Sequence, residues 1–485
     1  MSLSIRSFFN GNEFVLTILV AIVTAYLCFW NLGSAQLASW DESLYGVNAF
    51  EMDKRGEWLN PYYAGEPDQW NVKPPLMVSL IRVSQNLFGF NELGLRMPSA
   101  TAAFLLTFGF FLIIKRETDT TNAFLTTGML WGCTGLIGQH AGRSGDTDAV
   151  FAALLFFGAI SIYQFSKTLR GRHVLAAAFF FGLAFYAKST AVLLIVPSVL
   201  LFLWWKIGMS TILRNRNIWL GVTLFLAFPL SWIIINSIYG VSFGESDFGG
   251  SNSWTNSFFY DTIQRFSGTG HFVGKEKKWD FFLAFLDSRF NLWHIPFILT
   301  CIYLLLRFFR ILKKGIEAFR QSDPLLQFSL FMAVPFIGVL HISSNVNGWY
   351  FIPMLPFLAI ITAHGLQRLS SKMKMVPILW LGLVLFTTGR HMWEHQRFND
   401  ELKRFYAQVG EAVSETECLA VDKRLEPCHV LYAEWNSPCQ EFITEDGLAN
   451  GQFKSNYLLT NAANVPSFHS IISFKDIQLF EADNP

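Results

Sequence analysis

Charged residues are scarce in this sequence. Only 15% of its 485 residues are charged, against 52% that are hydrophobic and 16% that are aromatic. A soluble globular chain has about 25% charged residues, so the composition excludes an ordinary cytosolic enzyme and a disordered protein. The net charge of +1 excludes a general attraction of the chain to nucleic acid. We interpret the chain as a polytopic membrane protein.

Cysteine is also rare, with 6 residues in the chain, which excludes a disulfide scaffold. Three of them fall in apolar runs, and the other three lie in a polar C-terminal segment: Cys418, Cys428 and Cys439. These three form no CxxC pair and have no histidine at zinc spacing. If the segment lies in an oxidising compartment, one disulfide can form. Short loop closure favours Cys418–Cys428 or Cys428–Cys439.

Eleven apolar segments approach the roughly 20 residues that a membrane-spanning helix needs. They lie at 14–32, 96–114, 121–138, 149–166, 173–187, 190–205, 217–238, 291–309, 325–341, 349–367 and 375–392. The run 173–205 is interrupted by Lys188 and has basic residues before and after it. Because basic loops stay in the cytoplasm, both of its ends are placed inside. We therefore predict that it crosses twice, with Lys188 at the outer tip of a hairpin.

Loop charge also predicts the orientation. The proposed inner loops hold 16 lysines and arginines against 4 acidic residues, whereas the proposed outer loop 33–75 holds 7 acidic residues against 3 basic ones. The N-terminus is therefore placed in the cytoplasm and the C-terminus outside. We predict an all-α transmembrane domain over 1–392, with outer loops 33–95 and 239–290. A small extracytoplasmic α/β domain is predicted over 393–485.

An acidic pair follows the first predicted span. Asp41 and Glu42 lie between Trp40 and Tyr45, at the start of a predicted helix. Partial desolvation there can raise the basicity of a carboxylate, although two solvated loop acids are the alternative. We assign Asp41 as the acid–base centre and Glu42 as its support, free to hold a backbone amide or a cation.

Lys73 precedes two prolines in the same loop. The prolines hold Lys73 extended and start a helix within 74–90, which we expect to lie on the membrane surface. A lysine presented in this way is a point charge suited to a phosphate. The alternative is a lysine that snorkels beside a helix start.

Further ionisable residues fall on the same predicted face. Arg143 and Arg265 are guanidinium groups able to bind a phosphate, and Asp148 opens the fourth span, where it could instead cap the helix. Lys188 lies in an apolar hairpin, where burying a charge is energetically costly. An ionisable residue in such a place is by default a candidate for a functional role. His271 could join a carboxylate on a metal, although no second histidine follows at helical spacing. Together these groups predict a groove with acids for a hydroxyl and cations for a phosphate.

Several motifs together resemble a known superfamily. The segments WDESLYGVNAF, NVKPPLMVSLIRV, LGLRMPSATAAF, GRSGDTDAVFAALLFF and WYFIPMLPFLAI occur in this order. Over about 14–370 they resemble the GT-C glycosyltransferases, in the branch of the bacterial aminoarabinose transferases and protein O-mannosyltransferases. The resemblance implies the GT-C fold and a polyprenyl-phosphate sugar donor. It implies that Asp41 is the first acidic residue of the site, Lys73 its phosphate-binding lysine, Asp148 the acid opening the fourth span, and His271 the loop histidine.

The chain departs from the aminoarabinose branch at two motifs. Asn71-Val72 stands where that branch usually has an acidic residue before the lysine, and this leaves the metal site unknown. Asn347-Gly348-Trp349 stands where a basic residue is frequent. The C-terminal segment is also short for that branch, so specificity for lipid A does not carry over.

The sequence thus predicts an integral-membrane glycosyltransferase of the bacterial inner membrane. It would move a sugar from a polyprenyl-phosphate donor to a glycolipid, lipopolysaccharide or protein, with inversion at the sugar. The donor is a substrate, a divalent metal is left open, and the partners are donor, acceptor and membrane lipids, without nucleic acid. The alternatives are a flippase or transporter of a lipid-linked sugar, which needs a site near the midplane, and a structural membrane subunit.

Overall fold

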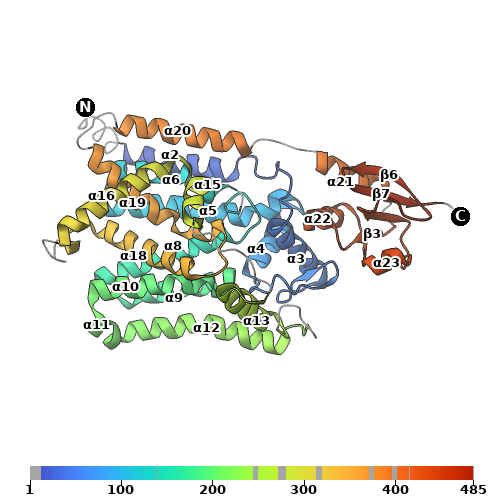
Figure 1. Ribbon diagram of the computed structural model, residues 1–485, viewed down its shortest axis with the longest axis horizontal. Helices are drawn as coiled ribbons and strands as arrows, with labels where there is room; N and C mark the ends of the chain where they lie inside the picture. Colours follow the sequence, from blue (N-terminus) through green and yellow to red (C-terminus); the bar gives the residue numbers. More distant parts are fainter. Residues whose placement is uncertain are drawn as a thin grey trace.

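The computed structural model describes residues 12–138, 140–243, 250–270, 280–312, 319–370, 376–395, 401–413 and 416–483. It is an elongated bundle of helices with a small mixed domain at one end (Figure 1). A helix occupies each of the eleven predicted apolar segments: α2 (Glu13–Phe29), α5 (Glu92–Glu117), α6 (Thr120–Trp131), α8 (Asp148–Thr168), α9 (Gly171–Lys188), α10 (Val196–Ile207), α12 (Arg216–Tyr239), α16 (His294–Leu312), α18 (Pro324–Ile342), α19 (Leu355–Ser370) and α20 (Val376–His395).

Six segments of the described chain are long and apolar enough to cross a membrane, by length and composition. They are Glu92–Glu117, Asp148–Thr168, Gly171–Ile207, Arg216–Tyr239, Pro324–Ile342 and Gly348–Arg368. The prediction of a multi-pass, mostly helical membrane protein is confirmed. Helix α20 continues to His395, past the predicted domain boundary at 392.

The chain turns back between α9 and α10. Gly171 lies against Asn217 at the start of α12, and Gly182 lies against Phe228 further along it, so α9 and α12 run in the same direction. The intervening 3₁₀ helix η1 (Ser189–Ile195) and α10 must therefore return the chain. The predicted hairpin with Lys188 at its tip is confirmed.

The first long loop is folded at the end of the bundle that meets the small domain. It contains α3 (Asp41–Arg55), the two-stranded ribbon β1 (Tyr62–Tyr63) and β2 (Glu66–Pro67), and α4 (Leu76–Phe88). Helix α4 buries Met77 and Ile81 and exposes Leu80, Val83 and Leu87. This apolar exposed side is the pattern expected of a helix on a membrane surface. The remaining short elements are α7 (Thr134–Ile137), α11 (Met209–Arg214), α13 (Ser253–Asn256), η2 (Ser257–Gln264), α14 (Arg265–Ser267), α15 (Phe281–Arg289), η4 (Asn291–Trp293) and η5 (Gly348–Met354).

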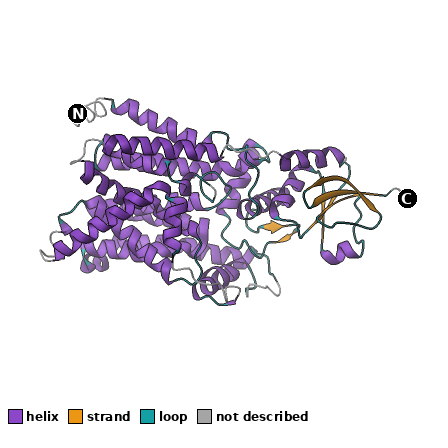
Figure 2. Ribbon diagram, turned by 45° about the horizontal axis from the view of Figure 1, so that its top comes forward, coloured by secondary structure: helices purple, strands orange, loops and turns teal. Residues whose placement is uncertain are grey.

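The C-terminal domain is a five-stranded mixed sheet with three helices, so the predicted α/β domain is confirmed (Figure 2). The strand order is β4-β3-β5-β7-β6, with β3 parallel to β4 and β5, and β7 antiparallel to β5 and β6. The elements are α21 (Glu401–Ala412), β3 (Leu419–Asp422), α22 (Pro427–Asn436), β4 (Gln440–Ile443), α23 (Glu445–Ala449), β5 (Tyr457–Thr460), β6 (Phe468–Phe474) and β7 (Ile477–Ala482).

The disulfide joins Cys418 to Cys439, so both predicted pairings were wrong. The parallel register pairs Leu419 of β3 with Gln440 of β4, which brings the two preceding cysteines side by side. Cys428 is buried in α22 as a free thiol. Loop length misled the prediction because strand pairing, not chain proximity, decides which cysteines meet.

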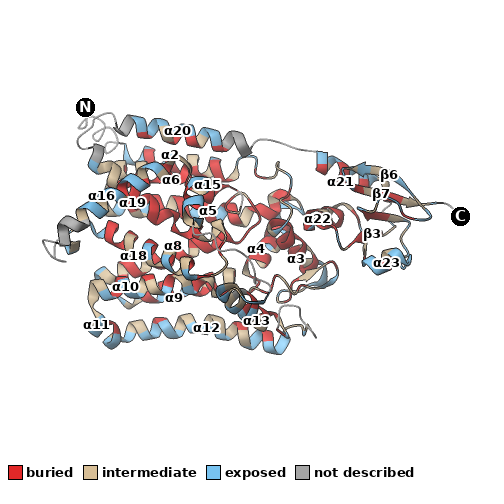
Figure 3. Ribbon diagram, viewed as in Figure 1, coloured by how far each residue is buried: buried red, intermediate tan, exposed pale blue. Residues whose placement is uncertain are grey.

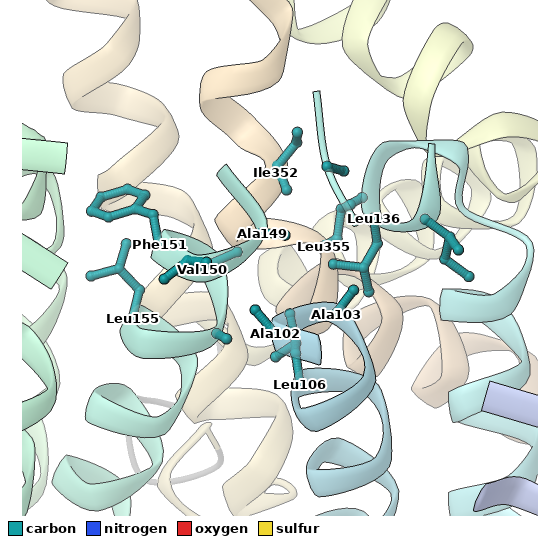
Figure 4. Packing of buried hydrophobic residues seen from close by; sticks show 14 of the residues in the cluster. Ala102, Ala103, Leu106, Leu136, Ala149, Val150, Phe151, Leu155, Ile352 and Leu355 are labelled. Atoms are coloured by element: carbon teal, nitrogen blue, oxygen red, sulfur yellow. The ribbon is translucent and has the colours of Figure 1, made fainter. Parts of the chain in front are cut away.

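The buried core runs through the centre of the bundle and continues beneath α3 and α4, whereas α12 exposes much of its surface (Figure 3). At its centre, Ala102, Ala103 and Leu106 of α5 pack near the start of α8 (Figure 4). Gly142 lies so close to Ala103 that an added Cβ would be 2.5 Å from the alanine Cβ. The segment 140–147 before α8 is therefore held tightly against α5.

Helix α22 docks the C-terminal domain onto α3. Leu431 packs against Gly46, and the Tyr432 hydroxyl donates to Glu92 at 2.8 Å. Two carboxyl groups also meet in this interface, Glu51 of α3 and Glu434 of α22, and both residues are buried. They share a hydrogen bond, while the Gly65 amide donates to Glu51 at 3.0 Å.

We expect this carboxyl pair to make stability depend on pH. Burial, reinforced by the charge of Glu51, raises the pKa of Glu434 well above its usual 4.5, and burial also raises the pKa of Glu51. A raised folded-state pKa gives stability that is complete at low pH and lost as pH rises through that value. Between about pH 5 and about pH 8, the unfolding temperature of Glu434→Gln should therefore fall less than that of the unsubstituted protein. Glu411→Gln, exposed on α21, is the control, and parallel curves for all three proteins would contradict the expectation.

Candidate active site

A cavity of about 520 Å³ opens where α3, α8 and the end of α9 meet the segments after α12 and α18. Its polar lining includes the following groups: Asp41, Lys73, Asp146, Asp148, Lys188, Thr190, Thr262, Arg265, Ser343, Asn345 and Asn347. Its aromatic and aliphatic lining includes Tyr45, Trp70, Phe151, Ala191, Leu194, Tyr260, Phe266, Leu340, Trp349 and Tyr350. Five of the predicted site residues line this cavity: Asp41, Lys73, Asp148, Lys188 and Arg265. A sixth, Glu42, follows Asp41 in α3.

Asp41 is the first residue of α3, so the helix start fixes its backbone beside the cavity. Its side chain remains 25% exposed. Burial and the charge of Asp146 raise the pKa of Asp41, while Lys73 and His140 oppose them. A raised pKa makes this carboxylate a stronger base than an ordinary aspartate.

His140 was not predicted as a site residue, although it lies between the carboxylates of Asp41 and Asp146. Its Nδ1 lies 2.8 Å from Oδ2 of Asp146 and 3.8 Å from Oδ2 of Asp41, and its ring stacks on Trp349 at a centroid distance of 4.5 Å. The pKa of His140 is raised above its usual value. Burial alone would lower it, but the hydrogen bond to Asp146 and the charges of the nearby acids have the larger effect. No periodicity marks this histidine; the only signal was its place six residues before Asp146 in the GQHAGRSGDTD segment.

Glu42 points away from the cavity and into the protein. Its carboxylate accepts from Arg96 Nε at 2.7 Å, from the Ala38 amide at 2.8 Å and from the Gly145 amide at 2.8 Å. It therefore holds a cation and backbone amides, as the sequence predicted for a supporting residue. The bond to Gly145 fixes the segment 140–147 relative to α3.

Replacing Glu42 should destabilise the protein. In Glu42→Gln the Arg96 guanidinium, 3% exposed, would keep its charge without its hydrogen-bonded counter-ion. Breaking a buried pair from one side costs about 3–5 kcal/mol, and denaturant titration in detergent should show a loss of that size. Glu411→Gln should be neutral. An unchanged unfolding midpoint for Glu42→Gln would show that Arg96 finds enough compensation from the three carbonyls it also contacts.

Lys73 also lines the cavity. Its Nζ lies 5.3 Å from the centroid of the Trp70 ring and 6.0 Å from that of Tyr45. These are cation–π distances, and among the described residues no salt bridge to Lys73 is formed. The ammonium group can therefore bind an anion in the cavity.

Two further cations meet at Tyr350. Lys188 forms a buried ion pair with Asp148 and lies 5.1 Å from the Tyr350 ring centroid. Arg265 donates to the Tyr350 hydroxyl. Asp148 is thus paired with a cation rather than capping its helix, since no side-chain cap forms at the start of α8.

Arg143 lies away from the cavity. Its guanidinium donates to the carbonyls of Leu27 at 3.1 Å and Trp30 at 2.8 Å, at the end of α2. Burial lowers the pKa of Arg143 to about 10. The structure therefore does not bring Arg143 together with Lys73, because Arg143 satisfies the last carbonyls of a helix. His271 lies outside the residues that the structure describes.

One group in the site offers metal ligands. A carboxylate oxygen of Asp41, a ring nitrogen of His140 and a carboxylate oxygen of Asp146 all lie within 4.8 Å of one another. Oxygen and imidazole ligands suit Mg²⁺, Mn²⁺ or Zn²⁺. Asn71, in the position usually acidic in the aminoarabinose branch, instead donates to Asn48 at 2.7 Å and takes no part in this group.

The sequence comparisons agree with the motifs. A family model described as dolichyl-phosphate-mannose-protein mannosyltransferase matches residues 72–235. A protein of Aquifex aeolicus is 26% identical over 385 residues, covering 78% of this chain and 69% of that protein. The undecaprenyl phosphate-α-4-amino-4-deoxy-L-arabinose arabinosyl transferase 1 of Pseudomonas fluorescens is 23% identical over 358 residues. The match covers 72% of this chain and 57% of that relative, so this chain spans under two thirds of its length.

The structural comparisons show the fold. The crystal structure of ArnT from Cupriavidus metallidurans bound to undecaprenyl phosphate superimposes with a TM-score of 0.71 at 15% identity, covering 96% of this chain and 97% of that one. The oligosaccharyltransferase of Archaeoglobus fulgidus gives a TM-score of 0.56 at 15% identity, covering 88% and 62%. The fold that the resemblance implies is therefore confirmed: the chain has the ArnT-like GT-C fold.

Proposed function

We propose that this protein is an integral-membrane glycosyltransferase that takes a sugar from a polyprenyl-phosphate donor. The observation that carries the proposal is one cavity in which the carboxylate of Asp41 faces Lys73, with Arg265 and Lys188 on the same lining. The undecaprenyl phosphate in the ArnT structure supports a polyprenyl-phosphate donor. Apolar lining residues such as Leu194, Phe266 and Leu340 suit the first isoprene units.

The cations match the charge that develops in the reaction. A sugar phosphodiester leaves as a phosphate monoester, so negative charge grows on its oxygens in the transition state. Lys73 and Arg265 can stabilise that charge, because preorganised cations act most strongly where charge develops. Lys188 is neutralised by Asp148 and would position Tyr350 rather than bind the phosphate.

Asp41 supplies the base on the other side of the sugar. It would take a proton from the acceptor hydroxyl as the hydroxyl attacks C1, in a single displacement that inverts the anomeric centre. The charge of His140 favours the ionised form of Asp41, and Asp146 holds the His140 ring through its 2.8 Å hydrogen bond. A divalent ion on Asp41, His140 and Asp146 would add a further positive charge near the phosphate. We propose a glycolipid, lipopolysaccharide or protein acceptor.

The test is transfer by the purified protein in nanodiscs, with a panel of undecaprenyl-phosphate sugars and bacterial glycolipid or protein acceptors. Release of undecaprenyl phosphate reports donor cleavage whichever acceptor is used. We expect acceptor-dependent release with at least one donor. Movement of intact donor across a proteoliposome membrane without cleavage would instead favour the flippase alternative.

We further propose a bacterial inner-membrane location with the site on the periplasmic face. The charge asymmetry of the loops predicts that a reporter fused after Pro485 reports the outside and one after Arg172 the inside. Alkaline phosphatase and green fluorescent protein fusions at both positions would measure this. A cytoplasmic C-terminus would reverse the orientation, or the number of crossings, that we propose.

A further inference from the structure

A second group of metal-ligand side chains lies in the C-terminal domain, away from the site described above. A carboxylate oxygen of Glu426, the Sγ of Cys428 and a ring nitrogen of His429 all lie within 4.8 Å of one another. They stand at the start of α22, where it faces the loop that precedes α3. The spacing Glu-Pro-Cys-His resembles no zinc-finger pattern, so only the folded helix start shows that the three groups converge.

The chemistry of this group is specific. Thiolate, imidazole and carboxylate are the three ligand types that Zn²⁺ uses in proteins, with bonds of about 2.0–2.3 Å that place ligand atoms about 3.3–3.8 Å apart. The described chain has four free cysteines, and Cys428 alone of them lies in the C-terminal domain. Its two cysteine neighbours in the domain are joined to each other as Cys418–Cys439.

His429 is already oriented by a neighbour. Its Nδ1 lies 2.8 Å from the hydroxyl of Tyr406, a residue with 0% exposure. If Nδ1 donates to that hydroxyl, Nε2 keeps its lone pair for an ion. Metal-binding histidines are held in this way by a hydrogen bond from their other nitrogen.

There is also room for an ion and an exchangeable ligand. The three residues line a cavity of about 500 Å³ formed by the loop 36–39, the start of α22 and the turn 474–477. Ser39, from that loop, hydrogen-bonds to both Glu426 and Cys428. Ser39 stands two residues before Asp41, so these hydrogen bonds already join the ligand side chains to the loop that leads into the candidate active site.

We propose that Glu426, Cys428 and His429 bind a zinc-class divalent cation, with water as the fourth ligand. The site is separate from the Asp41–His140–Asp146 group, which contains no sulfur. All three protein ligands belong to the start of α22, so the ion would fix this helix start, and the site does not depend on the proposed glycosyltransferase activity.

Cobalt substitution tests the proposal on the full-length protein, purified without reductant. Co²⁺ bound by a thiolate gives an intense near-ultraviolet charge-transfer band, which an oxygen and imidazole site cannot give. We expect the band to saturate at one equivalent, to be competed away by Zn²⁺, and to be lost in Cys428→Ser. Cys301→Ser, in the apolar helix α16, and His469→Ala, on the exposed β6, should keep it.

Two variants separate ligation from folding. His429→Ala should weaken Co²⁺ binding, and Tyr406→Phe, which removes only the orienting hydroxyl, should weaken it by about 10–100-fold. Asp146→Asn should leave the band unchanged, since it alters only the other group. A band that persists in Cys428→Ser, or no thiolate band in the unsubstituted protein with its fold intact by circular dichroism, would overturn the proposal.

Discussion

Lys73→Ala should abolish sugar transfer. Lys73 presents a charge to the cavity, forms no salt bridge among the described residues, and is held over the Trp70 and Tyr45 rings. The leaving phosphate gains charge in the transition state, and losing a preorganised donor to such charge costs about 10²–10³ in kcat. For a full ionic contact in a partly dry site we expect the upper end of this range or more. Folding should survive, because Lys73 lies on a cavity rather than in the core.

The Lys73→Arg variant tests whether the shape of the cation matters as well as its charge. Lys73→Arg should recover only part of the activity, because a planar guanidinium does not replace a point charge held at this position. Lys454→Ala removes the same charge from an exposed strand connection and should be neutral. Undecaprenyl phosphate binding, measured by thermal shift, should weaken in Lys73→Ala. Turnover at the unsubstituted rate would show that Lys73 only snorkels beside α4.

Asp41→Asn should reduce kcat by about 10²–10⁴, the range lost with a positioned general base. Donor binding should persist, since the cations on the cavity are unchanged. Because burial and Asp146 raise the pKa of Asp41, the acidic limb of the pH–rate profile should lie above the usual 3.8, with activity rising as pH rises through it. His140→Gln should shift that limb upward, since the charge of His140 lowers the pKa of Asp41.

Three comparisons decide the assignment of Asp41. Glu42→Gln should act through stability or KM, because its carboxylate faces Arg96 and not the cavity. If Asp41→Asn turns over normally while Asp148→Asn does not, Asp148 is the base. If neither matters, the acceptor attacks as an anion already, which would indicate a phosphate acceptor rather than a hydroxyl.

Local patterns along the chain determined the architecture. Apolar runs near 20 residues become helices, because in the bilayer core no water is present and the backbone must form its hydrogen bonds within its own segment. The basic flanks of 173–205 predicted the hairpin at Lys188 correctly, because loop charge is read segment by segment. The same patterns placed Asp41, Lys73 and Lys188 at one end of the bundle, where the structure gathers them around one cavity.

Contacts between distant segments were decided only by the tertiary structure. His140 meets Asp41 across a gap of 99 residues, and its importance depends on a loop conformation fixed by Glu42, Arg96 and the close packing of Gly142. Arg143 has the chemistry to bind phosphate, yet packing turns it toward the end of α2. The register of β3 with β4 chose the Cys418–Cys439 pair. Hydropathy and charge are properties of a segment, whereas the partner of a polar side chain depends on which segments pack against it.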